Sequence, residues 1–172
     1  MINFYKPNAK VSGAACSFYM NDKGEFFGTF IKQASWDEKR RQGKFDQNKK
    51  AIIKFSAKEF GDFINAILRK GEAKGYHQSA KQVVGFALSA STGEYAGSYT
   101  WSATVTAKDD STNKLSFFVT LDGGEAMLLL EHLRYLLQGH WKITDSEYHN
   151  KFEKEAPTTS APKEQSDDDM EW

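Results

Sequence analysis

The segment AIIKFSAKEFGDFINAILRKG, residues 51–71, indicates the fold more clearly than any other part of the chain. It opens with a short β-rich run, Ala51 to Ser56, and continues with a helical pattern from Ala57 to Gly71. Apolar residues in the helical part recur three and four positions apart, which is the spacing of one face of an α-helix. Those residues are Phe60, Phe63, Ile64, Ile67 and Leu68. Because glycine commonly ends helices, the segment predicts a strand followed directly by one helix that stops at Gly71.

A second segment repeats this order further along the chain. A β-rich run from Leu115 to Leu121 precedes a helical pattern from Gly124 to Gly139. Shifting the first segment by 65 positions superposes the two, with Leu68 falling on Leu133. Self-similarity of this kind favours an internal duplication of one supersecondary unit.

Further strand patterns precede each unit. In the first half they cover about Val11 to Asn21 and Glu25 to Ala34, joined by the turn-forming residues Asn21 to Gly24. In the second half they cover about Gln82 to Ser91 and Ser98 to Ala107. These strands match at a shift of 73 positions, so the first half has 8 extra residues in the connection that follows them.

The chain is therefore predicted to have an α+β fold. It comprises two tandem units of antiparallel β-strands, each followed by one α-helix that covers the sheets on one side. The units span about residues 10–75 and 76–141 of one domain, residues 1–150, and residues 151–172 form a tail. A length of 172 residues suits one ordinary domain, and a hydrophobic share of 40 % is enough for a packed core.

Charge is sorted along the chain although the net charge is zero. Residues 1–81 hold 16 Lys and Arg against 8 Asp and Glu, whereas residues 82–150 hold 4 against 8. The densest basic stretch contains Lys39, Arg40, Arg41, Lys44, Lys49 and Lys50, opposed only by Asp46. Such a stretch can be a solvated loop, but it also suits contacts with phosphates, because cations gain affinity by displacing the counterions of nucleic acid.

The first-half strands offer aromatic residues beside these cations. If Phe27, Thr29 and Ile31 face the helix, then Phe26, Phe30 and Lys32 face outward, near the outward Lys54 of the next strand. An outward face that mixes aromatic rings with lysines is typical of single-stranded nucleic-acid binding, since bases stack on rings while phosphates meet cations. With the opposite alternation the two phenylalanines would lie in the core instead.

The second half is poor in positive charge, which indicates a scaffold or a subunit interface rather than a second equal binding surface. Trp101 is expected in the core, and Tyr95, flanked by glycines, is expected to be exposed. The second helical pattern is apolar around more than half of its circumference, through Met127 to Leu130, Leu133, Leu136 and Leu137. That width exceeds what one sheet face covers and predicts a homo-oligomer assembled through this helix.

The tail is polar, contains Pro157 and Pro162, and lacks apolar periodicity, so it is predicted to be disordered. It nevertheless ends on an aromatic residue. Its last residues include Asp167, Asp168, Asp169, Met170, Glu171 and Trp172. Acidic residues that steer association, followed by a terminal aromatic anchor, favour a peptide that docks on partner proteins.

Catalytic and cofactor motifs are missing from the sequence. It has no phosphate-binding loop, no dinucleotide fingerprint and no H-E-x-x-H, and none of its four histidines is spaced as a metal pair. Asp109, Asp110 and Asp122 could form a metal-dependent nuclease site, but turn formation and helix capping explain them more simply. The single Cys16 excludes an internal disulfide and is expected to be buried. Because these motifs are missing, we expect a protein that has no enzymatic activity, cofactor or metal. The chain opens without a signal-peptide pattern, so we expect it in the cytoplasm.

Tandem strand-rich units, each closed by a helix and followed by an acidic tail, resemble the Whirly and transcriptional-coactivator (positive cofactor four) superfamily of single-stranded-DNA-binding proteins. The resemblance covers about residues 10–140, and its phage-encoded members are the nearer match because the Lys-Gly-Lys-Gly signature of plant Whirly proteins is absent. The ending SDDDMEW resembles the tails of replication single-strand-binding proteins. The resemblance implies DNA binding across the β-sheets, assembly into dimers or tetramers, and a tail that recruits replication or recombination enzymes and competes with DNA in cis.

Our hypothesis from the sequence is a sequence-independent single-stranded-DNA-binding protein that acts in phage or bacterial DNA replication, recombination or repair. The residues expected to contact the nucleic acid are Phe26, Phe30, Lys32, Trp36, Lys39, Arg40, Arg41, Lys44, Lys49, Lys50 and Lys54. One alternative is a single-strand-binding protein with an OB-fold, which would lack the duplicated helix. Another is a transcription-regulatory or protein-interaction adaptor of the same fold.

Overall fold

The structure, a computed structural model, describes residues 1–109, 112 and 114–155 and contains two antiparallel sheets of four strands each. Strands follow one another in chain order in both sheets. The first sheet comprises β1 (Ile2–Lys6), β2 (Ala14–Met20), β3 (Phe26–Asp37) and β4 (Gln42–Phe55). The second comprises β5 (Glu72–Gln78), β6 (Gln82–Ala90), β7 (Tyr99–Ala107) and β8 (Lys114–Leu121). Helix α1 (Ala57–Arg69) follows the first sheet, a 3-10 turn (Gly93–Tyr95) precedes β7, and helix α2 (Gly123–Glu155) follows the second sheet.

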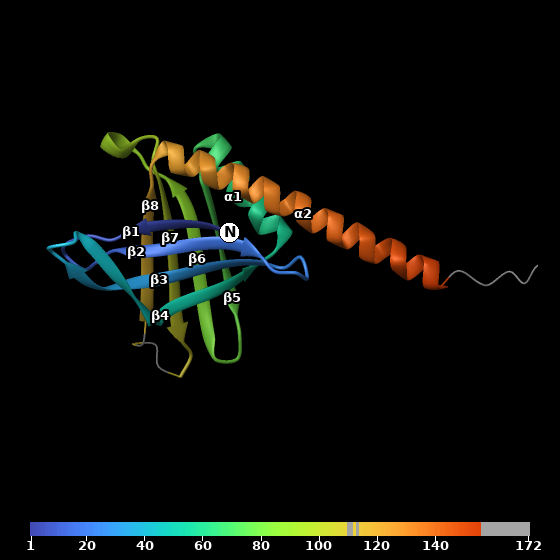
Figure 1. Ribbon diagram of the computed structural model, residues 1–172, viewed down its shortest axis with the longest axis horizontal. Helices are drawn as coiled ribbons and strands as arrows, with labels where there is room; N and C mark the ends of the chain where they lie inside the picture. The colour runs from blue at the N-terminus through green and yellow to red at the C-terminus, as the bar shows by residue number, and fades with distance from the viewer. Residues whose placement is uncertain (110–111, 113, 156–172) are drawn as a thin grey trace, which may run out of the picture.

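The two sheets pack face to face with their strands crossing at a steep angle (Figure 1). Aromatic side chains fill the space between the inner faces. Trp101 of β7 is fully buried, as predicted, with its ring 4.9 Å from that of Phe18 and 4.6 Å from that of Phe63. Aromatic pairs at these distances and tilts add to the hydrophobic stabilisation of the core. Helices α1 and α2 contact each other on the same side of the sheets (Figure 1).

Helix α1 forms where the sequence predicts it. Its first turn carries a capping box, in which the Glu59 amide donates to the Ser56 hydroxyl and the Ser56 amide donates to the Glu59 carboxylate. Lys70, in a left-handed conformation (φ 52°), caps the other end. The tandem strand-and-helix arrangement confirms the predicted α+β class.

Helix α2 is much longer than predicted, because it passes through Gly139 and continues to Glu155. A Cβ atom on Gly139 would lie 2.9 Å from the Met20 methyl group, so the glycine lets the helix approach β2 and does not end it. His140 still contacts Phe26 and the Gly24 carbonyl, and the later part of the helix extends away from the sheets (Figure 1). None of the helices in the described residues is long and apolar enough to span a membrane.

Strand patterns in the sequence missed β1 and β5 and placed the start of β4 at residue 51 instead of Gln42. The repeat spacing also needs a correction. A shift of 65 places the exposed Ile52 on the buried Phe117, whereas a shift of 66 places the buried Ile53 on the buried Val119. Consecutive apolar residues in both strands conceal the alternation, so the sequence alone gave the wrong register. The shift of 73 agrees with the structure, since it places Phe26 on Tyr99 and both are buried.

Candidate nucleic-acid interface

Strand β3 alternates in the opposite sense to the one predicted. Phe26 and Phe30 are 2 % and 0 % exposed and lie in the core, where Phe26 stacks on Phe60 at 4.4 Å. The prediction that these two phenylalanines face outward is therefore wrong, and neither can stack on a base. Lys32 pairs with the buried Ala14 at the end of the sheet and is itself only half exposed. Adjacent Phe26 and Phe27 make both alternations plausible in the sequence, and a slip of one residue exchanges the two faces.

The outer face of the first sheet nevertheless has the predicted chemistry. It carries Phe27, Thr29 and Ile31 on β3. Tyr19 of β2 lies opposite Phe27, and the two rings stack with centroids 5.5 Å apart and planes inclined by 21°. On its other side Phe27 pairs with Lys54 of β4, so two aromatic rings and an ammonium group form one row across the sheet.

Two more rows continue this face. Ser17, Thr29 and Ile52 lie opposite one another on three neighbouring strands, and Ile52 is exposed. In the next row Ile31 pairs with the exposed Lys50. The face thus combines Phe27, Thr29 and Ile31 on β3 with two lysines that flank Ile52 on β4.

Lys54 is an exposed cation with one acidic neighbour. Its Nζ donates to the Glu25 carboxylate at 2.5 Å, and Asn21 donates to the other carboxylate oxygen at 2.7 Å. The hydrogen bond from Lys54, supported by that from Asn21, lowers the pKa of Glu25 below its ordinary value. Because the pair is exposed to solvent, it is weak enough for a phosphate to replace the carboxylate.

The basic connection predicted between the strands is a β-hairpin. Beyond two register irregularities near Gln33, β3 and β4 pair again from Ser35 and Lys44 to Asp37 and Gln42. At the turn, the Asp37 carboxylate accepts hydrogen bonds from the backbone amides of Lys39 and Arg40, both at 3.0 Å. The hairpin therefore holds the basic residues on a defined scaffold that continues the first sheet.

Gln33 anchors the base of this hairpin. Its side chain is the buried polar group of the described core and makes four hydrogen bonds. The carboxamide oxygen accepts from the amides of Asn8 and Gly13 at 2.9 and 3.2 Å. The carboxamide nitrogen donates to the carbonyls of Asn8 and Ser35 at 2.9 and 3.1 Å. These hydrogen bonds pair backbone groups of the β1–β2 loop, at Asn8 and Gly13, and of the hairpin, at Ser35. The Gln33 side chain therefore links the loop to the hairpin.

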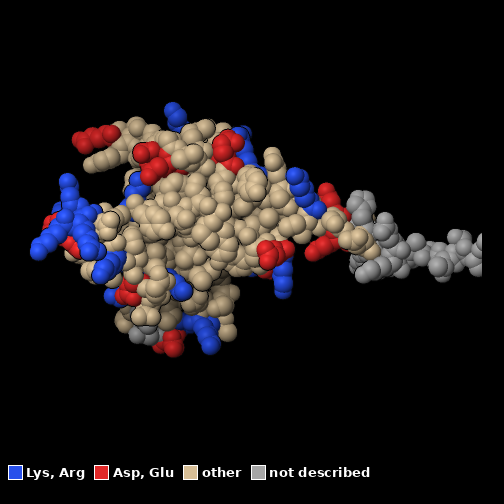
Figure 2. Space-filling model, in the orientation of Figure 1, with Lys and Arg blue, Asp and Glu red and all other residues tan. Residues whose placement is uncertain are grey.

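Positive charge collects on the hairpin. In Figure 2 the Lys and Arg side chains gather at the end of the molecule where Figure 1 places the β3–β4 turn. The exposed cations of this hairpin are Lys39, Arg40, Arg41, Lys44, Lys49 and Lys50. Asp46 lies 3.7 Å from Lys49 and offsets only part of the charge. Trp36, half exposed, pairs with Gly43 between these cations.

The structure brings most of the predicted contact residues onto one continuous surface and adds others. This surface consists of the solvent-facing side of the first sheet together with the β3–β4 hairpin. We call the whole of it the outer face. The surface residues that the sequence analysis missed are Tyr5, Tyr19, Phe27 and Phe45, and it also missed the buried Gln33 beneath the hairpin. Tyr5 and Phe45 contact each other at 5.7 Å beside the hairpin. The predicted turn at Asn21 to Gly24 carried a usable signal, because a hairpin centred there places Tyr19 opposite Phe27.

Other predicted features lie elsewhere. Cys16 is buried, as predicted, and burial raises the pKa of its thiol, so it is no nucleophile. Among the described residues, no three His, Cys, Asp or Glu side chains are grouped to hold a metal ion. The tail residues Asp167, Asp168, Asp169, Met170, Glu171 and Trp172 lie outside the described residues.

No family model and no curated protein matches the sequence. Solved structures do match the fold. The crystal structure of WHY1 from Arabidopsis thaliana superposes with a TM-score of 0.62 over 90 % of this chain and 91 % of its own, at 16 % identity. That of WHY3 from the same plant gives 0.62 over 90 % and 95 %, at 14 % identity. The chain has a Whirly-like fold. This fold confirms the resemblance expected from the order of strands and helices, and it sets aside the OB-fold alternative.

Proposed function

We propose that this protein binds single-stranded DNA without sequence preference through the outer face. The observation that carries the proposal is the row formed by Tyr19, Phe27 and Lys54, in which stacked rings adjoin an exposed ammonium group. The row is continuous with the cationic β3–β4 hairpin. The Whirly-like fold supports the proposal, because the family that the sequence resembles binds single-stranded DNA.

The surface suits a single strand better than a duplex. Each exposed base presents a flat apolar face that an aromatic ring can cover, and such stacking contributes roughly 1–3 kcal/mol per base whatever its identity. Duplex DNA offers no free base faces and would be held only by its phosphates. We therefore expect the rings to select the single-stranded form and the cations to supply affinity that depends on salt.

A fluorescence titration tests the proposal. Trp36 lies within the hairpin, so binding should quench the intrinsic tryptophan emission. We expect strong quenching by oligo-dT, weaker at higher salt, and little response to the matching duplex. Replacing Lys39, Arg40, Arg41 and Lys44 together by Gln should weaken binding and lower the salt-dependence slope by up to about 3, because each phosphate contact contributes roughly 0.7 on single strands.

A matched variant distinguishes the hairpin from charge in general. Lys58, Arg69, Lys74 and Lys142 are exposed cations outside the outer face, and their joint replacement by Gln removes the same charge. The control variant should bind nearly as the wild type does. Equal losses in both variants would show that the hairpin is not the binding site, and an absence of quenching at low salt would remove the nucleic-acid proposal.

Within this proposal the protein serves phage or bacterial DNA replication, recombination or repair. It works in the cytoplasm, which is that of the host cell if a phage encodes it, and it catalyses no reaction. Residues 167–172 form an acidic, aromatic-ended peptide that recruits partner proteins of the same processes and competes with DNA for the cations. Deleting residues 166–172 should leave DNA affinity unchanged or higher and abolish capture of the partner. Weaker DNA binding after the deletion would contradict the competition.

Assembly into a homo-oligomer belongs to the same proposal, and exposed apolar side chains on α2 support it. Leu129, Leu130 and Leu133 are buried against the body, but Leu128, Tyr135 and Trp141 are 62 %, 69 % and 54 % exposed. Exposed apolar side chains of this kind favour contact with a second copy. The same side chains would serve a protein-interaction adaptor, and the titration above separates the two functions, since an adaptor would bind DNA weakly and with little dependence on salt.

A further inference from the structure

A cavity lies where the second sheet reaches past the edge of the first. Figure 1 shows the β5–β6 turn and the neighbouring ends of β7 and β8 extending beyond β4. The cavity there has a volume of about 660 Å³. We call it the step, and the residues of its lining used below are Lys81, Gln82, Val105, Lys108, Asp109 and Leu115.

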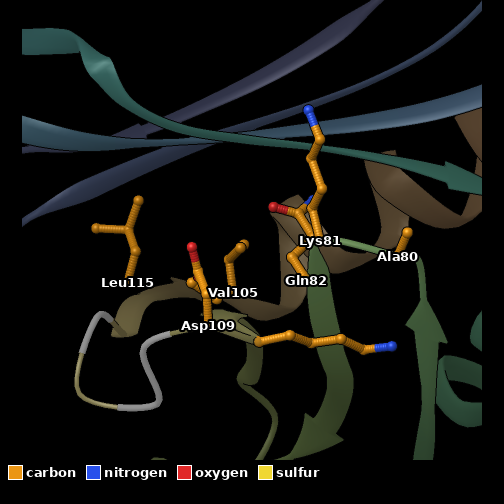
Figure 3. A pocket seen from close by; sticks show the side chains of 8 residues that line it. Ala80, Lys81, Gln82, Val105, Asp109 and Leu115 are labelled. Carbon is orange, nitrogen blue, oxygen red and sulfur yellow. The ribbon is translucent and has the colours of Figure 1, made fainter.

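The step combines an apolar floor with cations at its rim. Val105 and Leu115 are partly buried and project from the inner faces of β7 and β8. Lys81 and Lys108 are exposed on the two turns, which are tied together by a hydrogen bond from the Lys108 amide to the Lys81 carbonyl at 2.9 Å. Figure 3 shows Lys81 reaching from its turn toward the strands of the first sheet.

Polar groups complete the lining. The side chains of Gln82 and Asp109 border the cavity beside Val105 (Figure 3). A carboxamide both donates and accepts hydrogen bonds, and a carboxylate accepts them from amino groups such as those of cytosine, adenine and guanine. Together the step offers apolar surface for a base, acceptors and a donor for its edge, and ammonium groups for its phosphates.

The step is also connected to the outer face. A second groove, of about 150 Å³, runs between β4 and the β5–β6 hairpin and is lined by Ile52, Lys54 and Gln82 among others. Gln82 borders both this groove and the step, while Ile52 and Lys54 belong to the outer face. A polynucleotide lying across the first sheet would therefore cross the β4 edge and reach the step without leaving the protein surface.

We propose that the step is an additional nucleotide-binding site, which holds the part of a DNA single strand that passes the β4 edge. Lys81 and Lys108 contact its phosphates, and Val105 and Leu115 contact a base. At the base edge Gln82 donates or accepts a hydrogen bond, and Asp109 accepts one. The inference rests on the proposed function and extends it, because it predicts that the occupied length of DNA exceeds what the outer face alone covers.

Oligonucleotides of graded length test the step. Affinities would be measured for oligo-dT from about 6 to 20 nucleotides, a range set by the site sizes of single-strand-binding domains. In the Lys81→Ala, Lys108→Ala double variant, affinity for the shortest oligomers should equal that of the wild type. Affinity for the longest should fall about tenfold or more, and their salt-dependence slope should fall by about 1.4, because two phosphate contacts are lost.

A control variant removes the same charge elsewhere. The control is the Lys58→Ala, Lys142→Ala double variant, whose two lysines lie on α1 and α2. It should leave the dependence of affinity on oligonucleotide length unchanged. Equal melting temperatures of the two variants would show that both fold. Two results for the Lys81→Ala, Lys108→Ala variant would overturn the proposal that the step binds DNA. One is an unchanged affinity for long oligomers, and the other is an equal loss of affinity at all lengths. Failure of the proposed function gives a different result, since the wild-type protein would then bind no oligomer of any length.

Discussion

The two sheets share one topology, but their exposed faces differ. In the first sheet Tyr19 and Phe27 lie on the two central strands and stack on each other. In the second sheet the exposed aromatics are Tyr76 and Phe118, which lie on the two edge strands β5 and β8. The central strands between them present small and hydroxylated residues to solvent, such as Ser102 opposite Phe118. Lys74, the lysine nearest to this face on β5, pairs with Glu72 at 3.2 Å.

The inner faces are alike by contrast. Phe30 of the first sheet and Phe117 of the second are both fully buried, and their rings approach to 6.1 Å across the core. Each half must bury an apolar face to fold, so the inner residues are constrained in both. Outer residues are free of that constraint, and we infer that the first sheet uses this freedom for an aromatic and cationic surface while the second sheet does not.

The largest expected effect concerns the shared inner faces. Replacing Phe30 or Phe117 by Ala should each lower the free energy of unfolding by about 3–5 kcal/mol, because a buried ring leaves a cavity that the core fills only in part. The two losses should be similar, since both residues occupy the same interface between the sheets. Chemical denaturation of each variant measures them, and a small loss for either residue would show that the two halves do not share one core.

The next effect separates the outer faces. Phe27→Ala should weaken binding of oligo-dT by about 1–3 kcal/mol, the range measured for loss of one base-stacking ring. Phe118→Ala removes a ring from the second sheet that is 63 % exposed, more than the half-buried Phe27, and should leave the affinity nearly unchanged, because its cross-strand partner is Ser102 and not a ring or a lysine.

Phe118 is exposed, so its replacement should leave the melting temperature close to that of the wild type, whereas loss of the half-buried Phe27 should lower the melting temperature without unfolding the protein at the temperature of the titration. That stability measurement is the control for the binding result. Equal losses of affinity in Phe27→Ala and Phe118→Ala would mean that both sheets bind DNA, and the contrast between the outer faces would then be wrong.

Much of the fold could be predicted from the sequence, because periodicity is a local property. The apolar spacing of residues 57–71 and the alternation of Tyr99, Trp101 and Ala103 report burial directly, and the structure agrees with both. Gly139 could not be interpreted in the same way. Its function is to let α2 approach Met20, a residue far away in the sequence, and no local pattern records that contact.

The candidate site was predictable in composition but not in detail. Six of its cations stand together in the sequence, and the structure collects them on the hairpin. Which phenylalanines face outward depends on strand register, and in a run such as Phe26-Phe27 a one-residue slip satisfies the pattern equally well. Gln33 gave no signal either, because three of its four hydrogen bonds are to Asn8 and Gly13, in a segment that it meets only in the folded chain.

The smallest expected effect concerns the contribution to stability of a contact between helix α2 and strand β2. His132 of α2 donates a hydrogen bond from Nε2 to the Phe18 carbonyl of β2 at 3.0 Å. Partial burial lowers the pKa of His132 below its ordinary value of 6.5, so the folded protein favours the neutral ring. The unfolded chain takes up the proton more readily. The stability that the neutral ring contributes is therefore fully present above pH 6.5 and is lost as the pH falls below that value toward the lower pKa of the folded protein.

A His132→Gln variant keeps a side-chain donor for the Phe18 carbonyl but cannot be protonated. Melting temperatures of both proteins would be compared at about pH 8 and about pH 5.5, on either side of the histidine range. The wild type should lose more stability on acidification than the variant does, so the gap between them should narrow at the lower pH. Groups that the substitution does not touch contribute equally in both proteins and cancel in this difference. A gap that is the same at both values would show that α2 holds β2 through packing alone, without a contribution from the neutral ring.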